Sequence, residues 1–141
     1  MRILLVEDSY SISLTLRFAL EIEGHEVLSV ERGEQGLPLL QKHSFDLILL
    51  DLQTGGISAQ KFTEALKKIK TVKDDDSPIV CLFSASASIE DEARRLGIHH
   101  VIRKPFDCEQ LIFYLNSIQR RGTSWQINSL QSVESLAQLA C

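Results

Sequence analysis

Residues 45–56 read FDLILLDLQTGG, and this stretch decides the fold class of the chain. The apolar residues from Leu47 to Leu50 predict a strand that is buried on both faces. The strand ends in a carboxylate, Asp51, and a loop with two glycines follows. An acid at the tip of a buried strand needs a chemical reason, because an ionised carboxylate is costly to bury alone.

More short apolar runs lie on either side of this strand, at residues 3–6, 25–30, 78–83 and 99–102. Helical spacing of apolar residues after the first run, and again around Phe62 and Leu111, predicts that each strand is followed by a helix. This alternation predicts an α/β fold, with one parallel sheet covered by helices on both faces. Such sheets bind ligands beyond the carboxyl ends of their strands.

The composition is that of an ordinary globular domain, with 141 residues, 44% of them hydrophobic and 24% charged. A net charge of -4 argues against nucleic acid as a direct partner. The three cysteines, Cys81, Cys108 and Cys141, have no metal-ligand spacing, and their odd number favours reduced thiols. No signal peptide is evident and no apolar run reaches the ~18 residues of a membrane span, so a cytoplasmic location is expected.

Side chains that can bind a metal ion or take part in a reaction follow four of the predicted strands: Glu7 and Asp8, then Asp51, Ser84 and Lys104. Carboxylates brought together without a cation would repel one another and raise one another's pKa. A bound divalent ion keeps them ionised, and oxygen ligands without a His or Cys pattern favour Mg²⁺. The sequence therefore predicts a magnesium site at the strand ends.

A magnesium site beside a lysine and a hydroxyl suits a phosphoryl group. The ammonium neutralises phosphoryl oxygens, and the hydroxyl donates a hydrogen bond to one of them. Carboxylates are known to form aspartyl phosphates. Asp51 is the predicted nucleophile, because it stands alone at the end of the central strand.

Four segments together resemble the receiver domain of bacterial two-component response regulators: LLVEDS (4–9), LILLDLQTGG (47–56), FSA (83–85) and RKPF (103–106). The resemblance covers residues 1 to about 120. It implies a flavodoxin-like (βα)5 fold, a doubly wound parallel sheet with strand order 2-1-3-4-5.

The resemblance also implies a role for each site residue. The metal ligands that it implies are Glu7, Asp8, Asp51 and the backbone carbonyl of Gln53. Asp51 would be the phosphoacceptor and Ser84 the switch hydroxyl. Lys104 would be the site lysine, followed by a proline that usually has a cis peptide bond.

The function implied is that of a signalling domain rather than an enzyme. A histidine kinase or a histidine phosphotransfer protein would supply the phosphoryl group, with Mg²⁺ as cofactor, and the domain would catalyse its own phosphorylation and slow dephosphorylation. The signal would pass by contact to a downstream protein, through the face made by the fourth helix, fifth strand and fifth helix. No membrane partner is expected, and a second copy of the chain is a further candidate partner.

Two alternatives stay open. The chain could be the receiver portion of a longer DNA-binding or enzymatic response regulator. It could instead be a pseudo-receiver that docks to its partners without phosphorylation. The sequence also departs from the receiver pattern: the loop after Asp51 lacks the usual proline, and Val101 replaces the usual aromatic residue three positions before Lys104. A more flexible loop and a different signal route are expected.

The C-terminal part is predicted to be a tail rather than a second domain. The last helix is expected to carry Leu111, Leu115 and Ile118 and to end before Gly122. From Arg120 onward no strand partner is expected. We therefore divide the chain into a receiver domain, residues 1–121, and a tail, residues 122–141, that forms a short helix or a linker.

Overall fold

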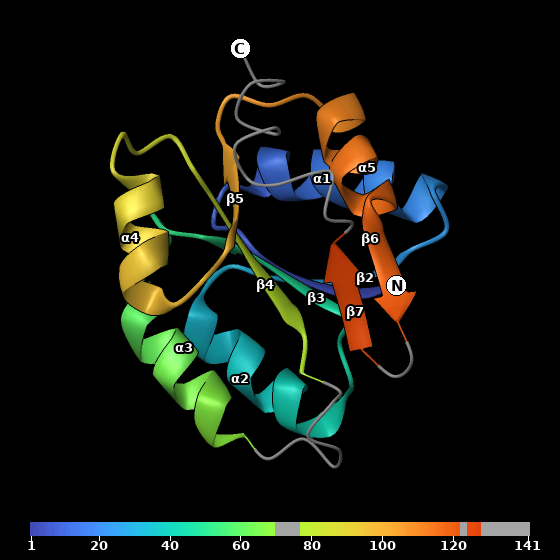
Figure 1. The fold of residues 1–141 in the computed structure, drawn as a ribbon. Helices are drawn as coiled ribbons and strands as arrows, with labels where there is room; N and C mark the ends of the chain where they lie inside the picture. Colours follow the sequence, from blue (N-terminus) through green and yellow to red (C-terminus); the bar gives the residue numbers. More distant parts are fainter. Residues whose placement is uncertain (70–76, 122–123, 128–141) are drawn as a thin grey trace.

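The computed structural model describes residues 1–69, 77–121 and 124–127. Strands and helices alternate through the described chain up to Asn116 (Figure 1). The strands are β1 (Arg2–Val6), β2 (Glu26–Val30), β3 (Leu47–Asp51), β4 (Ile79–Ser84) and β5 (His100–Arg103). The helices are α1 (Tyr10–Ile22), α2 (Gly33–Lys42), α3 (Ala59–Lys68), α4 (Ile89–Leu96) and α5 (Cys108–Asn116). This alternation confirms the prediction of a helix after each strand.

These five strands form one sheet in the order β2-β1-β3-β4-β5, with every neighbouring pair parallel. The predicted strand order is confirmed. The register places Val6 opposite Leu50 and Asp51 opposite Phe83. Because parallel strands all point the same way, the residues after their carboxyl ends meet at one edge of the sheet.

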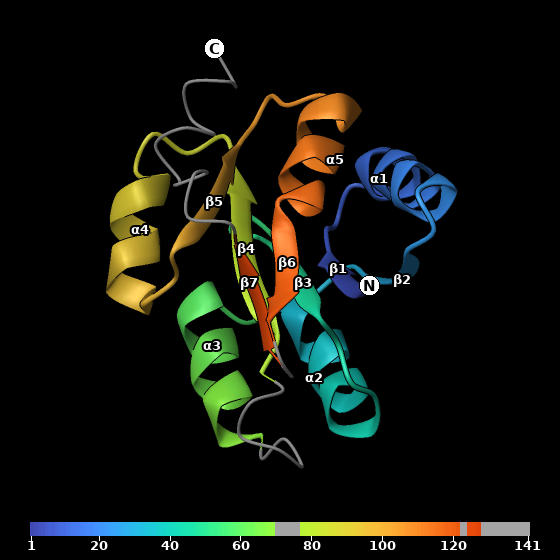
Figure 2. The ribbon, with the colours of Figure 1, turned by 45° about the vertical axis from the view of Figure 1, so that its right-hand side comes forward.

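Helices cover both faces of the sheet: α1 and α5 lie on one face, and α2, α3 and α4 lie on the other (Figures 1 and 2). Successive residues of each central strand point to opposite faces, so the sheet has two separate cores. Ile3, Leu5, Leu47 and Leu49 pack with α1 and α5. Leu4, Val6, Ile48 and Leu50 pack with the other three helices. Burial on both faces explains why β1 and β3 read as continuous apolar runs.

Helix caps place the site loops. The Ser9 side chain caps α1, immediately after the acids that follow β1, and the Ser58 hydroxyl accepts a 3.2 Å hydrogen bond from the Lys61 N–H at the start of α3. At α5, Asp107 and Gln110 form a reciprocal capping box. Each cap satisfies free backbone N–H groups, so it fixes where the preceding loop ends.

The chain after α5 differs from the prediction. The helix ends at Asn116, and Ile118 begins β6 (Ile118–Arg121), which pairs antiparallel with β7 (Ser124–Ile127). The prediction of no strand partner after Arg120 is therefore wrong. Only two residues separate the paired strands in the sequence, so β6 and β7 form a β-hairpin.

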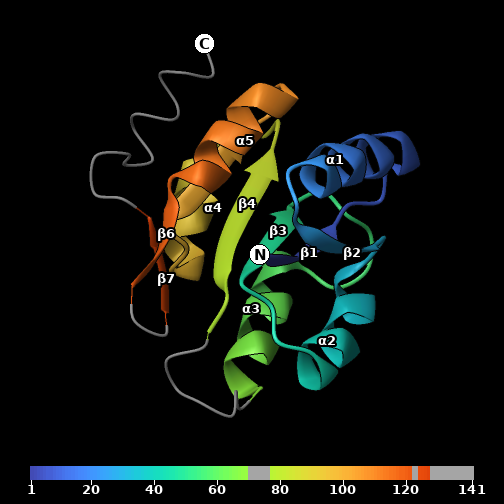
Figure 3. The ribbon, with the colours of Figure 1, turned by 90° about the vertical axis from the view of Figure 1, so that its right-hand side faces the viewer.

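The β6–β7 hairpin continues from the end of α5 as a sheet of its own (Figure 3). The tail from residue 128 onward, for which a short helix or a linker is predicted, lies outside the described residues. The boundary between receiver and tail at residue 121 stays a prediction. Within the described part of the chain, no helix combines the length and apolar character needed to cross a membrane.

Candidate functional site

The structure brings together the three acids that the sequence singled out. One carboxylate oxygen from each of Glu7, Asp8 and Asp51 lies within 4.8 Å of the others. Glu7 and Asp8 follow β1, and Asp51 is the last residue of β3, the strand next to β1 in the sheet. With Lys104, these acids form a group that we call the acid pocket.

The three acids differ in their exposure to solvent. The side chains of Glu7 and Asp51 are almost inaccessible, since the residues are 2% and 4% exposed, whereas Asp8 is exposed. Burial raises the pKa of Glu7 above its usual value, and the hydrogen bond from Lys104 opposes that rise. Asp51 adds negative charge that raises the pKa of Glu7 further.

Lys104 is the shared counter-charge of the two buried acids. Its Nζ lies 3.0 Å from Glu7 Oε2 and 3.2 Å from Asp51 Oδ2. The same ammonium lies 4.8 Å from the centre of the Phe83 ring. The peptide bond from Lys104 to Pro105 is cis, as the resemblance implies. One ammonium thus links the ends of β1 and β3 with the loop after β5.

The donor set fits a hard divalent cation. The acid pocket holds three carboxylates and one ammonium, so a divalent ion would balance its remaining negative charge. Within the described ranges, Asp8 makes no hydrogen bond or ion pair, so its carboxylate is available to bind a metal. Gln53 contacts the pocket through its N–H, which donates to Asp51 Oδ1 at 3.0 Å. Its carbonyl as a metal ligand remains a prediction.

Ser84 lies beside the acid pocket. It is the last residue of β4, it is fully buried, and it directly follows Phe83, the register partner of Asp51. Its hydroxyl oxygen accepts a 3.1 Å hydrogen bond from the Ser86 N–H, and its carbonyl accepts one from the Lys104 N–H at 2.9 Å. The hydroxyl is thus held at the start of the loop between β4 and α4.

Sequence reasoning missed Glu34, which lies in the first turn of α2. Its carboxylate accepts a 3.0 Å hydrogen bond from the Ile57 N–H in the loop after β3. This bond lowers the pKa of Glu34. The loop after β3, which lacks a proline, is therefore held by a hydrogen bond to α2. Gly56 lies directly beneath this carboxylate and has a φ of +89°.

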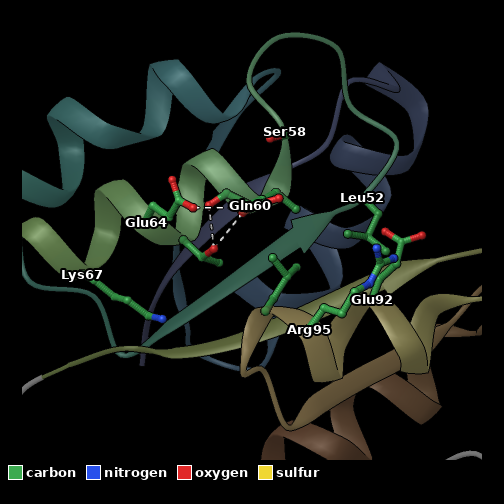
Figure 4. A pocket seen from close by; sticks show the side chains of 10 residues that line it. Leu52, Ser58, Gln60, Glu64, Lys67, Glu92 and Arg95 are labelled. Atoms are coloured by element: carbon green, nitrogen blue, oxygen red, sulfur yellow. Dashed lines mark hydrogen bonds between the residues drawn. The ribbon is translucent and has the colours of Figure 1, made fainter.

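A small cavity of about 160 Å³ is lined by Glu7 and Asp8, and two larger cavities lie on other sides of the site. A largely apolar hollow of about 690 Å³ lies between α1 and the start of α5, and Ile12, Lys104 and Phe106 are among its lining residues. A polar groove of about 570 Å³ runs between α3 and α4. Figure 4 shows Glu64 and Lys67 of α3 on one side of this groove and Glu92 and Arg95 of α4 on the other.

Comparison with known proteins identifies the family of the chain. The family model of the response regulator receiver domain matches residues 3–116. The chain therefore belongs to the receiver domain family of response regulators. The cell cycle response regulator CtrA of Brucella abortus is 35% identical over 126 residues, which are 86% of this chain and 51% of that protein. The chain spans about half the length of the curated relatives it matches.

Solved structures show the same fold. The chemotaxis response regulator CheY4 of Vibrio cholerae has a TM-score of 0.70 and 26% identity, over 82% of this chain and 95% of that one. A CheY-like receiver domain protein from Methanospirillum hungatei has a TM-score of 0.67 and 26% identity, over 82% and 90% of the two chains. Receiver domains are signalling domains that accept phosphoryl groups, and dependence on Mg²⁺ is a general property of the family.

Proposed function

We propose that this receiver accepts a phosphoryl group on Asp51 from a histidine kinase or a histidine phosphotransfer protein. The observation that carries the proposal is the environment of Asp51. Its carboxylate is buried at the end of the central strand, 3.2 Å from an ammonium, with two further acids within 4.8 Å. A carboxylate so placed has both a counter-charge and a metal-binding neighbourhood.

In the transfer, a carboxylate oxygen of Asp51 attacks the phosphorus of a phosphohistidine. An O–P bond forms as the N–P bond breaks, and the imidazole leaves as a neutral ring after it takes up a proton. Lys104 lies where its ammonium can neutralise a phosphoryl oxygen. The Ser84 hydroxyl, whose oxygen accepts from the Ser86 N–H, can donate a hydrogen bond to another phosphoryl oxygen. Mg²⁺, when held by Glu7, Asp8, Asp51 and the Gln53 carbonyl, supplies further positive charge to those oxygens.

Slow return to the resting state is part of the proposal. Attack by water on the aspartyl phosphate releases inorganic phosphate and restores the carboxylate of Asp51. Asp51 is 4% exposed, so little water reaches it directly. The domain thereby hydrolyses the phosphoryl group that it carries itself, and it has no separate substrate in this step.

The α1 side of the pocket is the proposed docking face for the phosphoryl donor. Tyr10, Leu14, Phe18 and Ile22 are exposed and follow one another at intervals of four residues, so they form an apolar ridge along α1. The ridge begins two residues after Asp8, and the hollow between α1 and α5 adjoins Lys104. A partner helix on this ridge would hold its histidine close to the acid pocket.

The downstream contact is proposed to use α4, β5 and α5, and a second copy of the chain is a further candidate partner. The proposal also includes a cytoplasmic location, which is usual for response regulators. One observation favours a second candidate function. Because the curated relatives are about twice the matched length, this receiver can serve as the input part of a longer response regulator.

Mass spectrometry after incubation with acetyl phosphate and Mg²⁺ tests the proposed function. We expect one added phosphoryl mass on the wild-type chain and none on Asp51→Asn. The control is Asp91→Asn, an equivalent change at an exposed aspartate of α4, which should still be phosphorylated. Mass addition that survives Asp51→Asn would contradict the assignment. No addition to the wild type would favour a docking module that works without phosphorylation.

A further inference from the structure

Arg103 connects three elements next to the acid pocket. It is the last residue of β5 and directly precedes Lys104. Its Nη1 donates a 3.3 Å hydrogen bond to the Ser86 carbonyl in the loop between β4 and α4. Its Nη2 forms an ion pair with the Glu90 carboxylate in the first turn of α4. We call this arrangement of Arg103, Ser86 and Glu90 the loop clasp.

The loop clasp reaches the switch hydroxyl through a single residue. Ser86 donates its N–H to the Ser84 hydroxyl at 3.1 Å, and its own carbonyl accepts from Arg103. The bond from Arg103 to the Ser86 carbonyl therefore also helps to fix the position of the Ser86 N–H, which donates to the Ser84 hydroxyl. Further along the loop, the Ser86 and Ser88 hydroxyls lie 3.0 Å apart, and the Ser88 hydroxyl donates to Glu92 of α4.

We propose that Arg103 is a positioning residue for Ser84, and that the loop clasp stabilises the loop conformation of the unphosphorylated domain. The proposal rests on the proposed phosphorylation of Asp51. To reach a phosphoryl oxygen on Asp51, the Ser84 side chain moves toward Asp51, and the Ser86 N–H that donates to it either follows or loses its bond. The loop then shifts, and the bond from Arg103 to the Ser86 carbonyl is strained or lost. The loop clasp thus opposes activation and sets its equilibrium.

Two features support a role for Arg103 in this chain. The usual aromatic switch position holds Val101, which is buried in the core between β5 and α4 and has a single side-chain torsion. The guanidinium instead presents several donors in a rigid plane, so one side chain can hold both a carbonyl and a carboxylate.

The other side of α4 lines the groove between α3 and α4, through Glu92 and Arg95 (Figure 4). A shift of α4 therefore changes the shape of that groove.

Titration with beryllofluoride and Mg²⁺, followed by NMR, tests the proposal, because beryllofluoride mimics the aspartyl phosphoryl group. Arg103→Met removes both contacts of the loop clasp, so it should bind beryllofluoride about fivefold more tightly than the wild type. Glu90→Gln removes only the ion pair that holds the guanidinium, so it should tighten binding in the same direction but by less. The double variant should bind no more tightly than Arg103→Met alone, since that variant already lacks both contacts of the guanidinium. Mere structural damage would weaken binding, so the direction of the change separates positioning from folding.

The matched control is Asp91→Asn, which breaks the 3.4 Å ion pair between Asp91 and Arg94 on the same helix. That pair does not involve Ser86 or Arg103, so binding should equal that of the wild type. Unchanged or weaker binding by both Glu90→Gln and Arg103→Met would overturn the role of the loop clasp. If the wild type itself failed to bind beryllofluoride, the proposed function would fail first, and the role of Arg103 with it.

Discussion

The acid pocket and the loop clasp lie side by side at the same edge of the sheet, yet they are built differently. In the acid pocket, two carboxylates are nearly inaccessible and share one ammonium. In the loop clasp, the Arg103 and Glu90 side chains are 39% and 34% exposed, and the guanidinium divides its contacts between a helix and a loop. The pocket follows the receiver pattern closely, whereas the surroundings of the clasp depart from it at Val101.

This difference matches two physical requirements. Phosphoryl transfer needs charges held in a fixed arrangement before the reaction, and burial among rigid strands provides that arrangement. Signal output needs an element with two accessible conformations that differ by only a small free energy. Partly exposed ion pairs contribute little stability, typically below about 1 kcal/mol, so they can break when a stronger contact forms nearby. The pocket is thus suited to chemistry and the loop clasp to switching.

The largest expected effect is the loss of the shared ammonium. Lys104→Met leaves Glu7 and Asp51 buried without their counter-charge, and we expect it to lower the free energy of unfolding by about 2 kcal/mol at neutral pH. Urea denaturation measures this loss. Lys61→Met removes an exposed lysine on α3 and should change stability far less. Equal losses in the two variants would show that the pocket does not depend on Lys104.

The pH dependence of the Lys104→Met deficit sharpens this test. The pKa of Glu7 is already raised above 4.5 by burial, and the loss of Lys104 raises it further. A carboxyl group with a raised folded-state pKa gives stability that is complete below its unfolded pKa and is lost as pH rises through the folded pKa. The deficit should therefore be largest at neutral pH and shrink as pH falls toward 4.5. A deficit that grows on acidification would contradict this explanation.

Metal binding should depend strongly on Asp8, the acid of the pocket to which no described residue makes a hydrogen bond or ion pair. Asp8→Ala removes the exposed carboxylate of the pocket, so Mg²⁺ affinity should fall by at least about tenfold, or ~1.4 kcal/mol. NMR shifts during a Mg²⁺ titration measure the affinity. Glu23→Ala, a change at an exposed acid at the end of α1 opposite to Asp8, is the control and should leave the affinity close to that of the wild type. An unchanged titration for Asp8→Ala would exclude Asp8 as a ligand.

A smaller effect is expected in the loop after β3. A Cβ added at Gly56 would lie 2.2 Å from a Glu34 carboxylate oxygen, and the φ of +89° disfavours other residues. Gly56→Ala should therefore lower stability by about 1 kcal/mol. Gly55→Ala is the matched control, since a Cβ there would meet only Arg32 Nε, at 4.0 Å. Thermal unfolding measures the melting temperatures of both variants. Equal melting temperatures would show that Glu34 does not constrain this loop.

The sequence predicted the acid pocket well for a local reason. Each pocket residue lies at the end of a strand or just after it, and buried parallel strands are recognisable from short apolar runs. Parallel strands then bring those ends together without further information. The five-stranded sheet and its order were predictable from the same pattern and the family resemblance.

Long-range contacts explain what the sequence did not reveal. Glu34 meets a loop 23 residues away, and Arg103 meets Ser86 17 residues away, so no local spacing marks either contact. The end of α5 was placed too late because Ile118 continues the apolar helical spacing, although Ser117 caps the helix and Ile118 pairs with Ile127. Tertiary or hairpin pairing overrides local periodicity in such cases.

The central claim is that a phosphoryl group on Asp51 acts on the loop after β4 rather than on the side chain at position 101. Amide and methyl NMR shifts, recorded with and without beryllofluoride and Mg²⁺, test this most directly. We predict large amide shifts for residues 85–88 and small methyl shifts for Val101, with both absent in Asp51→Asn. Val101 methyl shifts as large as those loop amide shifts would show that β5 carries the signal, and would contradict the account.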